Sequence, residues 1–180
     1  MRRVRYRVAA SLDGYIAGPN GEIDWIVHDP AVDPRELFAG IDTVLLGRRT
    51  DEATQQPGAP PWPAGWRVFV FSKTLRPEEH RNVTIIAGDA PATVVALRAE
   101  RGKDIWLFGG GGLFRSLLDA KLVYVVEIAV VPVLLGGGVP LVEPGAVRTR
   151  LNLVVHDVYP AGSLLYDTKC TPALAKAKAG

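Results

Sequence analysis

Residues 104–108 form an apolar segment that runs directly into four consecutive glycines, Gly109 to Gly112. An apolar run of this length is typical of a buried strand. A helix is predicted to follow at once, because apolar residues recur on one helical face: Leu113, Phe114, Leu117 and Leu118. Residues without a Cβ let the backbone approach a bulky group, and unpaired N–H groups at a helix start attract an anion. We expect the pyrophosphate of a nucleotide at this junction; the alternative is a flexible turn that needs positive φ angles.

The common nucleotide-binding motifs do not match this junction. A Rossmann fingerprint requires a third glycine where Phe114 stands. A Walker-type phosphate loop requires Gly-Lys-Ser/Thr, whereas the first lysine after the glycines is Lys121. The junction therefore points to a different family of nucleotide-binding proteins.

Length and composition indicate one globular domain. The chain has 180 residues, of which 48% are hydrophobic and 22% charged, and this length is enough to bury a full core. We predict a single domain over residues 1–170 and a disordered tail over residues 171–180, which are rich in Ala and Lys.

Several classes of protein are disfavoured. A net charge of +2 gives no reason to expect nucleic acid as a partner. The single cysteine, Cys170, allows no internal disulfide, and three scattered histidines make no metal-ligand cluster, so we expect no metal and a cytoplasmic location. Residues 1–7 lack the apolar core of a signal peptide. The apolar residues 122–142 are interrupted by Pro132 and three glycines, which favours two buried strands over a membrane span.

Strands and helices are expected to alternate along the chain. The patterns predict strands at residues 4–10, 42–47, 67–72, 83–87, 105–108, 123–131, 151–158 and 163–168. They predict helices at residues 34–38, 48–55, 92–101 and 113–120. This order indicates an α/β fold with a mixed, mostly parallel sheet of about eight strands, flanked by helices and ending in an antiparallel hairpin.

Ligands bind beyond the carboxyl ends of the strands in such sheets. Polar or glycine-rich segments follow several of the expected strands: Asp13, Asp24, residues 47–50, residues 72–73 and residues 109–112. We expect the topology to bring these segments onto one edge of the sheet, although they are far apart in the sequence.

Several segments together resemble the dihydrofolate reductase-like superfamily, and in particular its branch with the reductase domain of bacterial riboflavin biosynthesis, the deaminase-reductase family. These segments are Ser11–Gly21 with Ile23–Trp25, Asp42–Thr50, Val70–Lys73, Asp104–Gly110 and Pro132–Gly138. The resemblance covers nearly all of residues 1–170. It implies an NADPH site, a small-molecule substrate and a homodimer.

The resemblance also implies which residues contact each ligand. The cofactor would contact Ala10, Ile16, Trp25, Gly47, Arg48, Thr50, Ser72, Lys73, Gly109, Gly110, Gly111, Gly112, Leu113 and Phe114. The substrate would contact Asp13, Asp24 and Phe108, and Asp24 would be the catalytic acid.

Two of these segments suit the phosphates of NADPH. Residues 47–50 open a helix after a strand, so that N–H groups, the Thr50 hydroxyl and a guanidinium converge there. Lys73 is a point charge, which suits a 2′-phosphate better than a ribose hydroxyl. Without the resemblance, the first segment would be a helix start with solvated arginines, and Ser72–Lys73 would be a surface turn.

The loop after the first strand is the candidate for proton transfer. Asp13 and Gly14 resemble part of a mobile loop that closes over nicotinamide and substrate and excludes water. Trp25 resembles the aromatic residue that borders the nicotinamide, and Asp24 beside it would support protonation of a ring nitrogen. Alternatively, Trp25 belongs to the core and Asp24 caps a helix that follows.

Three departures distinguish this chain from the riboflavin reductases that it resembles. One is Gly110-Gly111-Gly112, where those enzymes usually have Gly-Pro-Thr. Phe108 stands where those enzymes carry an acidic residue for the pyrimidine. Asp51 stands where an aromatic residue commonly follows the Gly-Arg-x-Thr pattern. Loss of an acceptor at position 108 disfavours the pyrimidine of riboflavin biosynthesis as the substrate.

We therefore predict an NADPH-dependent reductase of a small heterocyclic, pterin- or pyrimidine-like substrate. The alternatives are the 5-amino-6-(5-phosphoribosylamino)uracil reductase of riboflavin biosynthesis and a nucleotide-binding module without turnover. Arg3, Arg5 and Arg7 share one face of the first strand and are expected to be exposed. A subunit interface or a phosphate-bearing substrate would also use them, whereas nucleic-acid binding is disfavoured.

Overall fold

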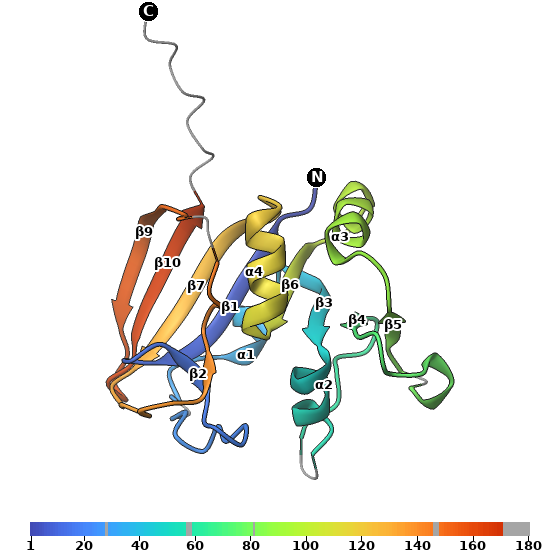
Figure 1. The fold of residues 1–180 in the computed structure, drawn as a ribbon. Helices are drawn as coiled ribbons and strands as arrows, with labels where there is room; N and C mark the ends of the chain where they lie inside the picture. Colours follow the sequence, from blue (N-terminus) through green and yellow to red (C-terminus); the bar gives the residue numbers. More distant parts are fainter. Residues whose placement is uncertain (28, 57–58, 81, 146–147, 171–180) are drawn as a thin grey trace, which may run out of the picture.

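The computed structural model describes residues 1–27, 29–56, 59–80, 82–145 and 148–170. Its main sheet has eight strands in the order β5-β4-β3-β6-β1-β7-β10-β9 (Figure 1). The strands are β1 (Val4–Ser11), β3 (Ile41–Gly47), β4 (Arg67–Phe71), β5 (Thr84–Ile86), β6 (Asp104–Gly109), β7 (Val123–Val131), β9 (Leu151–Val158) and β10 (Leu164–Cys170). Neighbours from β5 to β7 are parallel, and β10 is antiparallel to β7 and β9. The predicted mixed, mostly parallel sheet with a terminal hairpin is confirmed.

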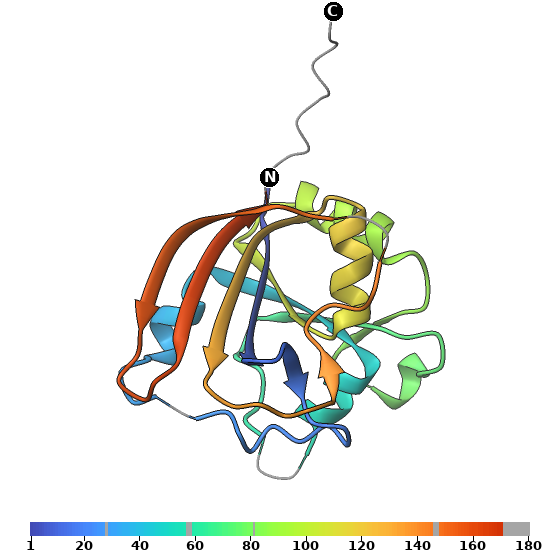
Figure 2. The same cartoon turned by 60° about the vertical axis from the view of Figure 1, so that its left-hand side comes forward.

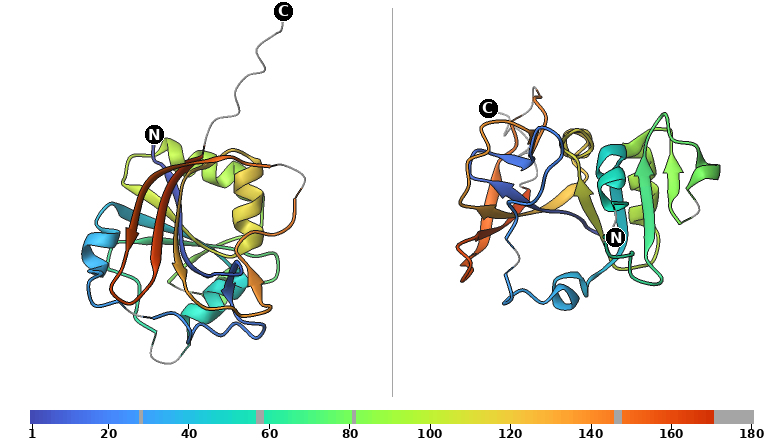
Figure 3. Two further views of the ribbon diagram at one scale, coloured as in Figure 1. Left: turned by 90° about the vertical axis from the view of Figure 1, so that its left-hand side faces the viewer. Right: turned by 90° about the horizontal axis from the view of Figure 1, so that it is seen from below.

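The helices form layers on both faces of this sheet (Figures 2 and 3). Helices α3 (Ala90–Ala99) and α4 (Gly111–Asp119) cover one face, and α1 (Pro34–Phe38) lies against the other. Helix α2 (Arg48–Thr54) lies beyond the end of β3, and a short 3-10 helix, η1 (Pro77–Glu79), precedes β5. Aspartates cap α1 and α3: Asp33 accepts a hydrogen bond from the Arg35 amide and Asp89 from the Ala92 amide.

A small second sheet pairs β2 (Tyr15–Ala17) with β8 (Val139–Pro140). Residues 15–17 are predicted to lie in a loop, whereas they form β2. Of the two strands expected within residues 122–142, the first is β7 and the second is β8, which is only two residues long. Strand β7 ends at Val131 because Pro132 has no N–H group to continue a ladder. Residues 133–138 then form a loop along the carboxyl edge of the main sheet, and only two residues return to strand geometry.

Alternating side chains divide the core between the two faces of the sheet. In β6, Ile105 and Leu107 face α3 and α4, whereas Trp106 and Phe108 pack on the opposite face. That second face carries an aromatic cluster of Phe38, Trp62, Trp66, Trp106 and Phe108. Burial of Trp106 and partial burial of the other four rings stabilise this half of the molecule.

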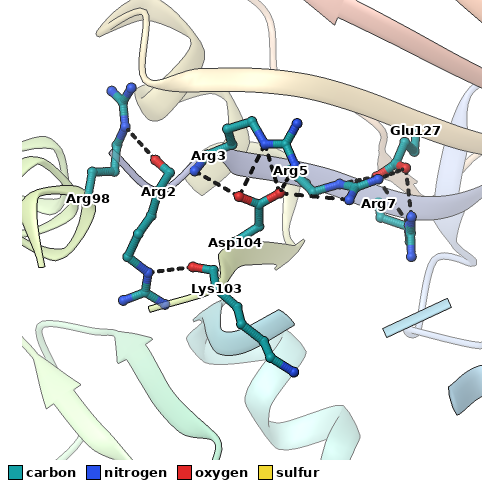
Figure 4. A network of polar contacts seen from close by, with 8 residues as sticks. All are labelled: Arg2, Arg3, Arg5, Arg7, Arg98, Lys103, Asp104 and Glu127. Carbon is teal, nitrogen blue, oxygen red and sulfur yellow. Dashed lines mark hydrogen bonds and ion pairs between the residues drawn. The ribbon is translucent and has the colours of Figure 1, made fainter. Parts of the chain in front are cut away.

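The arginines of β1 are paired within the chain (Figure 4). Arg5 and Arg7 both donate hydrogen bonds to Glu127 of β7, which is only 4% exposed. Arg3 pairs with Asp104, at 2.7 Å. The expectation that these arginines are exposed is therefore wrong for Arg5 and Arg7, whose side chains are 23% and 18% exposed. They are half-buried, and a carboxylate on the neighbouring strand neutralises them.

The pKa of Glu127 shows how this cluster is balanced. Burial raises the pKa of the carboxyl, but hydrogen bonds and charge from Arg7 and Arg5 outweigh it and hold the pKa below its ordinary 4.5. A carboxyl with a lowered folded-state pKa stabilises the fold above its unfolded-state pKa. This contribution is lost as the pH falls through the lower, folded-state value.

We predict that Glu127→Gln lowers the free energy of unfolding at neutral pH by roughly 3 kcal/mol, because two half-buried guanidiniums lose their counter-charge. The variant should also show a smaller loss of stability than the wild type as the pH drops below 4.5. Urea unfolding at several pH values measures both effects. Glu78→Gln, at an exposed position of η1, is the matched control. Equal stability of Glu127→Gln and this control would contradict the assignment.

Residues 171–180 lie outside the described residues, so the single domain and disordered tail stay predictions. Within the ranges described above, the helices are too short or too polar to span a membrane.

Candidate active site

The turns that follow β3 and β6 meet at the carboxyl edge of the sheet. The two strands are parallel neighbours, and Leu46 pairs with Gly109. A Cβ built on Gly47 would lie only 3.5 Å from the backbone nitrogen of Gly110. Gly47 and Gly110 are the N-cap residues of α2 and α4, and neither helix start has a side-chain cap. Two helix starts with uncapped N–H groups therefore adjoin each other.

The glycines after β6 differ in what surrounds them. Helix α4 begins at Gly111, so Gly111 and Gly112 belong to its first turn rather than to the preceding loop. A Cβ on Gly111 would lie 2.5 Å from the Pro140 carbonyl oxygen, whereas one on Gly112 would have ordinary contacts. The Thr50 hydroxyl lies 3.6 Å from the Cβ position of Gly110. Gly111 is thus required by packing, while Gly110 exposes backbone next to a hydroxyl.

A second part of the edge lies at the end of β4. Ser72 and Lys73 line a cavity of about 160 Å³ together with Ile86, Gly88 and Ala90. The Ser72 hydroxyl accepts hydrogen bonds from the amides of two residues that follow it. Lys73 is exposed.

Arg48, the first residue of α2, links this helix to the turn after β4. Its guanidinium donates to the Thr74 hydroxyl at 2.9 Å and to Glu52 at 2.7 Å. Arg48 of the predicted segment 47–50 therefore contacts Thr74, the residue directly after the predicted segment 72–73. The sequence interpretation missed Thr74 and the residues after β5, although Gly88 follows a parallel strand and signals the same edge.

Asp13 joins two loops of this edge. Its carboxylate accepts hydrogen bonds from the amides of Leu135 and Gly136 and from the Ser11 hydroxyl. The Ser11 hydroxyl, with help from those amides, lowers the pKa of Asp13. With its oxygens occupied in this way, Asp13 is placed to hold the loop after β1 against the loop after β7.

Asp24 and Trp25 lie in a loop that is held by its own hydrogen bonds. The Trp25 indole donates to the Glu22 carbonyl at 3.0 Å, and the Gly18 amide donates to the same oxygen. Asp24 is exposed and no helix begins there, so it is not an N-cap. Among the described residues, no hydrogen bond links either side chain to the glycine turn, and their roles stay predictions.

The remaining predicted residues occupy different environments. Ala10 is buried at the end of β1, Ile16 is half-buried in β2, and Leu113 is half-buried in the first turn of α4. The Phe114 ring stacks on Tyr6 in the core, and its amide donates to the Gly110 carbonyl. Phe114 thus has no free polar group for a cofactor, because its face of α4 packs on the sheet.

Phe108 belongs to the aromatic cluster at the end of β6. Its ring contacts Trp106 at 4.5 Å and Trp62 at 6.0 Å between centroids. The substrate side of the edge is therefore apolar at this point. Across the described ranges, no three His, Cys, Asp or Glu side chains converge in a way that would hold a metal ion.

The family of the chain follows from a comparison with known proteins. The family model of the RibD C-terminal domain matches residues 2–165. This chain belongs to the RibD C-terminal domain family. Two relatives from Bacillus subtilis (strain 168) have no characterised function. YyaP is 30% identical over 174 residues, 89% of this chain and 91% of its own length, and YwjB is 33% identical over 157 residues, 84% and 89% of the two chains.

Solved structures share the fold. A protein assigned to riboflavin biosynthesis from Shewanella sp. PV-4 has a TM-score of 0.82 and 26% identity, and the match covers 96% of this chain and 100% of that one. Dihydrofolate reductase from Enterococcus faecalis, solved with NADP(H), has a TM-score of 0.64 and 21% identity over 93% and 95% of the two chains. The likeness to the second structure shows the dihydrofolate reductase-like fold alone.

We predict that Gly111→Ala lowers the free energy of unfolding by about 1–3 kcal/mol, because the added methyl group collides with the Pro140 carbonyl. Gly112→Ala, one position along the same helix, should be neutral or stabilising by about 0.5–1 kcal/mol. Thermal and urea unfolding compare the two variants directly. Similar stabilities would contradict the close packing of α4 against β8.

Proposed function

We propose that this protein is an NADPH-dependent reductase of a small heterocyclic, pterin- or pyrimidine-like substrate. The observation that carries the proposal is the contact between two uncapped helix starts, at Gly47 and Gly110. The turn at Ser72–Lys73 lies nearby, because Arg48 of α2 donates a hydrogen bond to Thr74, the next residue of that turn. Helix starts and cationic side chains on one edge suit a ligand with several phosphate groups. Membership in the RibD C-terminal domain family supports the same conclusion.

The residues present fit NADPH. Gly110 has no side chain to cover its backbone, and the Thr50 hydroxyl lies next to it. These groups would hold the pyrophosphate, and Lys73 at the cavity beyond β4 would hold the 2′-phosphate. When bound, the cofactor supplies a hydride, and the protein contributes orientation, electrostatics and exclusion of water. The E. faecalis relative of the same fold was solved with NADP(H).

The loops at the other end of this edge would enclose the substrate. Asp13 fixes the loop after β1 to that after β7, so these loops act together in excluding water. Asp24 is the proposed proton donor, because it is the acid next to Trp25 in the loop after β2.

The riboflavin-pathway reductase is a second candidate. The family and the Shewanella protein favour it. Phe108, embedded in an aromatic cluster, offers no hydrogen-bond acceptor where the pyrimidine would need one. Turnover of 5-amino-6-(5-phosphoribosylamino)uracil with NADPH would decide for this candidate.

We predict that Lys73→Ala weakens NADPH binding by about 10- to 100-fold and changes NADH binding little, because only NADPH carries the 2′-phosphate. Fluorescence titration of both cofactors measures the two affinities. Arg101→Ala removes the same charge at an exposed position just before β6, at the opposite edge of the sheet, and should leave both affinities unchanged. Equal losses for NADPH and NADH would argue against this role of Lys73.

We also propose that the protein forms a homodimer through β9. This edge strand is exposed along its whole length and is largely apolar, with Leu153, Val154 and Val155 exposed at 44% or more (Figure 1). An open, apolar edge strand readily pairs with a second chain.

We predict that Val155→Lys converts a dimer to a monomer, because a charge on the edge strand opposes strand pairing. Size-exclusion chromatography with light scattering should give twice the mass of one chain for the wild type. Val95→Lys makes the same exchange at an exposed position of α3 and should leave the dimer intact. A monomeric wild type would refute the proposal.

A further inference from the structure

Residues 138–141 are held tightly between two parts of the carboxyl edge. Their strand, β8, pairs with β2 on one side and adjoins the start of α4 on the other (Figure 2). A Cβ built on Gly138, where φ is +143°, would overlap with the Ala17 carbonyl oxygen. A Cβ on Gly111, the first residue of α4, would lie 2.5 Å from the Pro140 carbonyl oxygen. Close packing on both sides means that a shift of this segment also moves β2 or the helix start.

The backbone of Leu141 joins this segment to the loop after β1 and to the core. Its amide donates a hydrogen bond to the Gly14 carbonyl at 2.9 Å. Its carbonyl accepts a hydrogen bond at 2.9 Å from the Tyr6 hydroxyl, which lies 135 positions earlier in the chain. Asp13 binds the amides of residues 135–136 at the other end of the same segment. The chain after β7 is therefore attached to the loop after β1 at two points, and Tyr6 secures the second.

Tyr6 connects this point to α4 as well. Its side chain is fully buried, and its ring stacks on Phe114 in the first turns of α4, with 3.7 Å between the centroids. Burial raises the pKa of the Tyr6 hydroxyl far above its ordinary value, so the hydroxyl keeps its proton and stays a donor. One rigid side chain thus contacts the helix through its ring and the Leu141 carbonyl through its hydroxyl.

We propose that Tyr6 is a positioning residue, whose hydroxyl holds residues 138–141 against the start of α4 and so fixes the shape of the edge. The inference rests on the proposed function, because the N–H groups at this helix start are those proposed to hold the pyrophosphate of NADPH. Tyr6 is buried and acts through the backbone of Leu141 rather than by contact with the ligand. A site that is held in shape before the ligand arrives binds more tightly, because less ordering is required on binding.

The test compares Tyr6→Phe with Thr168→Val. Each variant removes one hydroxyl that donates to a backbone carbonyl and leaves the side-chain shape nearly unchanged; the Thr168 hydroxyl donates to Val126 at 2.7 Å, between β10 and β7. In Tyr6→Phe, exchange of the Leu141 amide should become about tenfold faster and NADPH binding about 5- to 10-fold weaker. Thr168→Val should change neither quantity, even where both variants lose similar global stability. Hydrogen exchange followed by NMR and fluorescence titration give the two readouts.

A second pair of variants disturbs the same segment from its other side. Gly138→Ala places a methyl group against the Ala17 carbonyl at a positive φ, so it should displace residues 138–141. We expect it to accelerate Leu141 exchange and to weaken NADPH binding by a factor similar to that of Tyr6→Phe. Gly137→Ala adds its methyl group to open space and should behave as the wild type.

Equal rates of Leu141 exchange in Tyr6→Phe and Thr168→Val would overturn the proposal. If the wild type binds NADPH, equal NADPH affinities of these two variants would overturn it as well. Lack of NADPH binding by the wild type would instead refute the reductase. A selective loss of Leu141 protection in Tyr6→Phe would then still support the positioning of residues 138–141 by Tyr6.

Discussion

The close approach of two backbones at the carboxyl edge of the sheet determines the rest of the candidate site. Gly47 and Gly110 end neighbouring parallel strands and begin separate helices, and a side chain on Gly47 would contact the Gly110 nitrogen. This approach aligns two sets of helix N–H groups without using any charged residue. Arg48 links the start of α2 to the turn that carries Lys73, which places two positively charged side chains near this edge. The proposed cofactor binding would therefore depend on the same backbone atoms that join β3 and β6 to their helices.

The face of the sheet opposite α3 and α4 has two chemically different halves. Around β3, β4 and β6 it is aromatic, and around β1 and β7 it is ionic, with Glu127 between Arg5 and Arg7. Pairing within the chain removes these arginines as a surface for nucleic acid or for an anionic substrate. The Arg7 guanidinium also lies over the Phe38 ring, 5.9 Å from its centroid, which joins the two halves.

Sequence patterns predicted the sheet because each strand is marked by its own apolar run and each edge segment by glycine or a polar residue. They failed for β2, which is too short to show alternation. They failed for Arg5 and Arg7 because the pairing with Glu127 joins residues more than a hundred positions apart.

The most direct test of the central claim is to follow backbone amide NMR signals of the protein while NADPH is added. The account predicts that the largest shifts fall on residues 47–50, 72–74 and 110–113, which share one edge, while β9 and β10 are little affected. Shifts confined to other regions, or no shifts at millimolar NADPH, would contradict it.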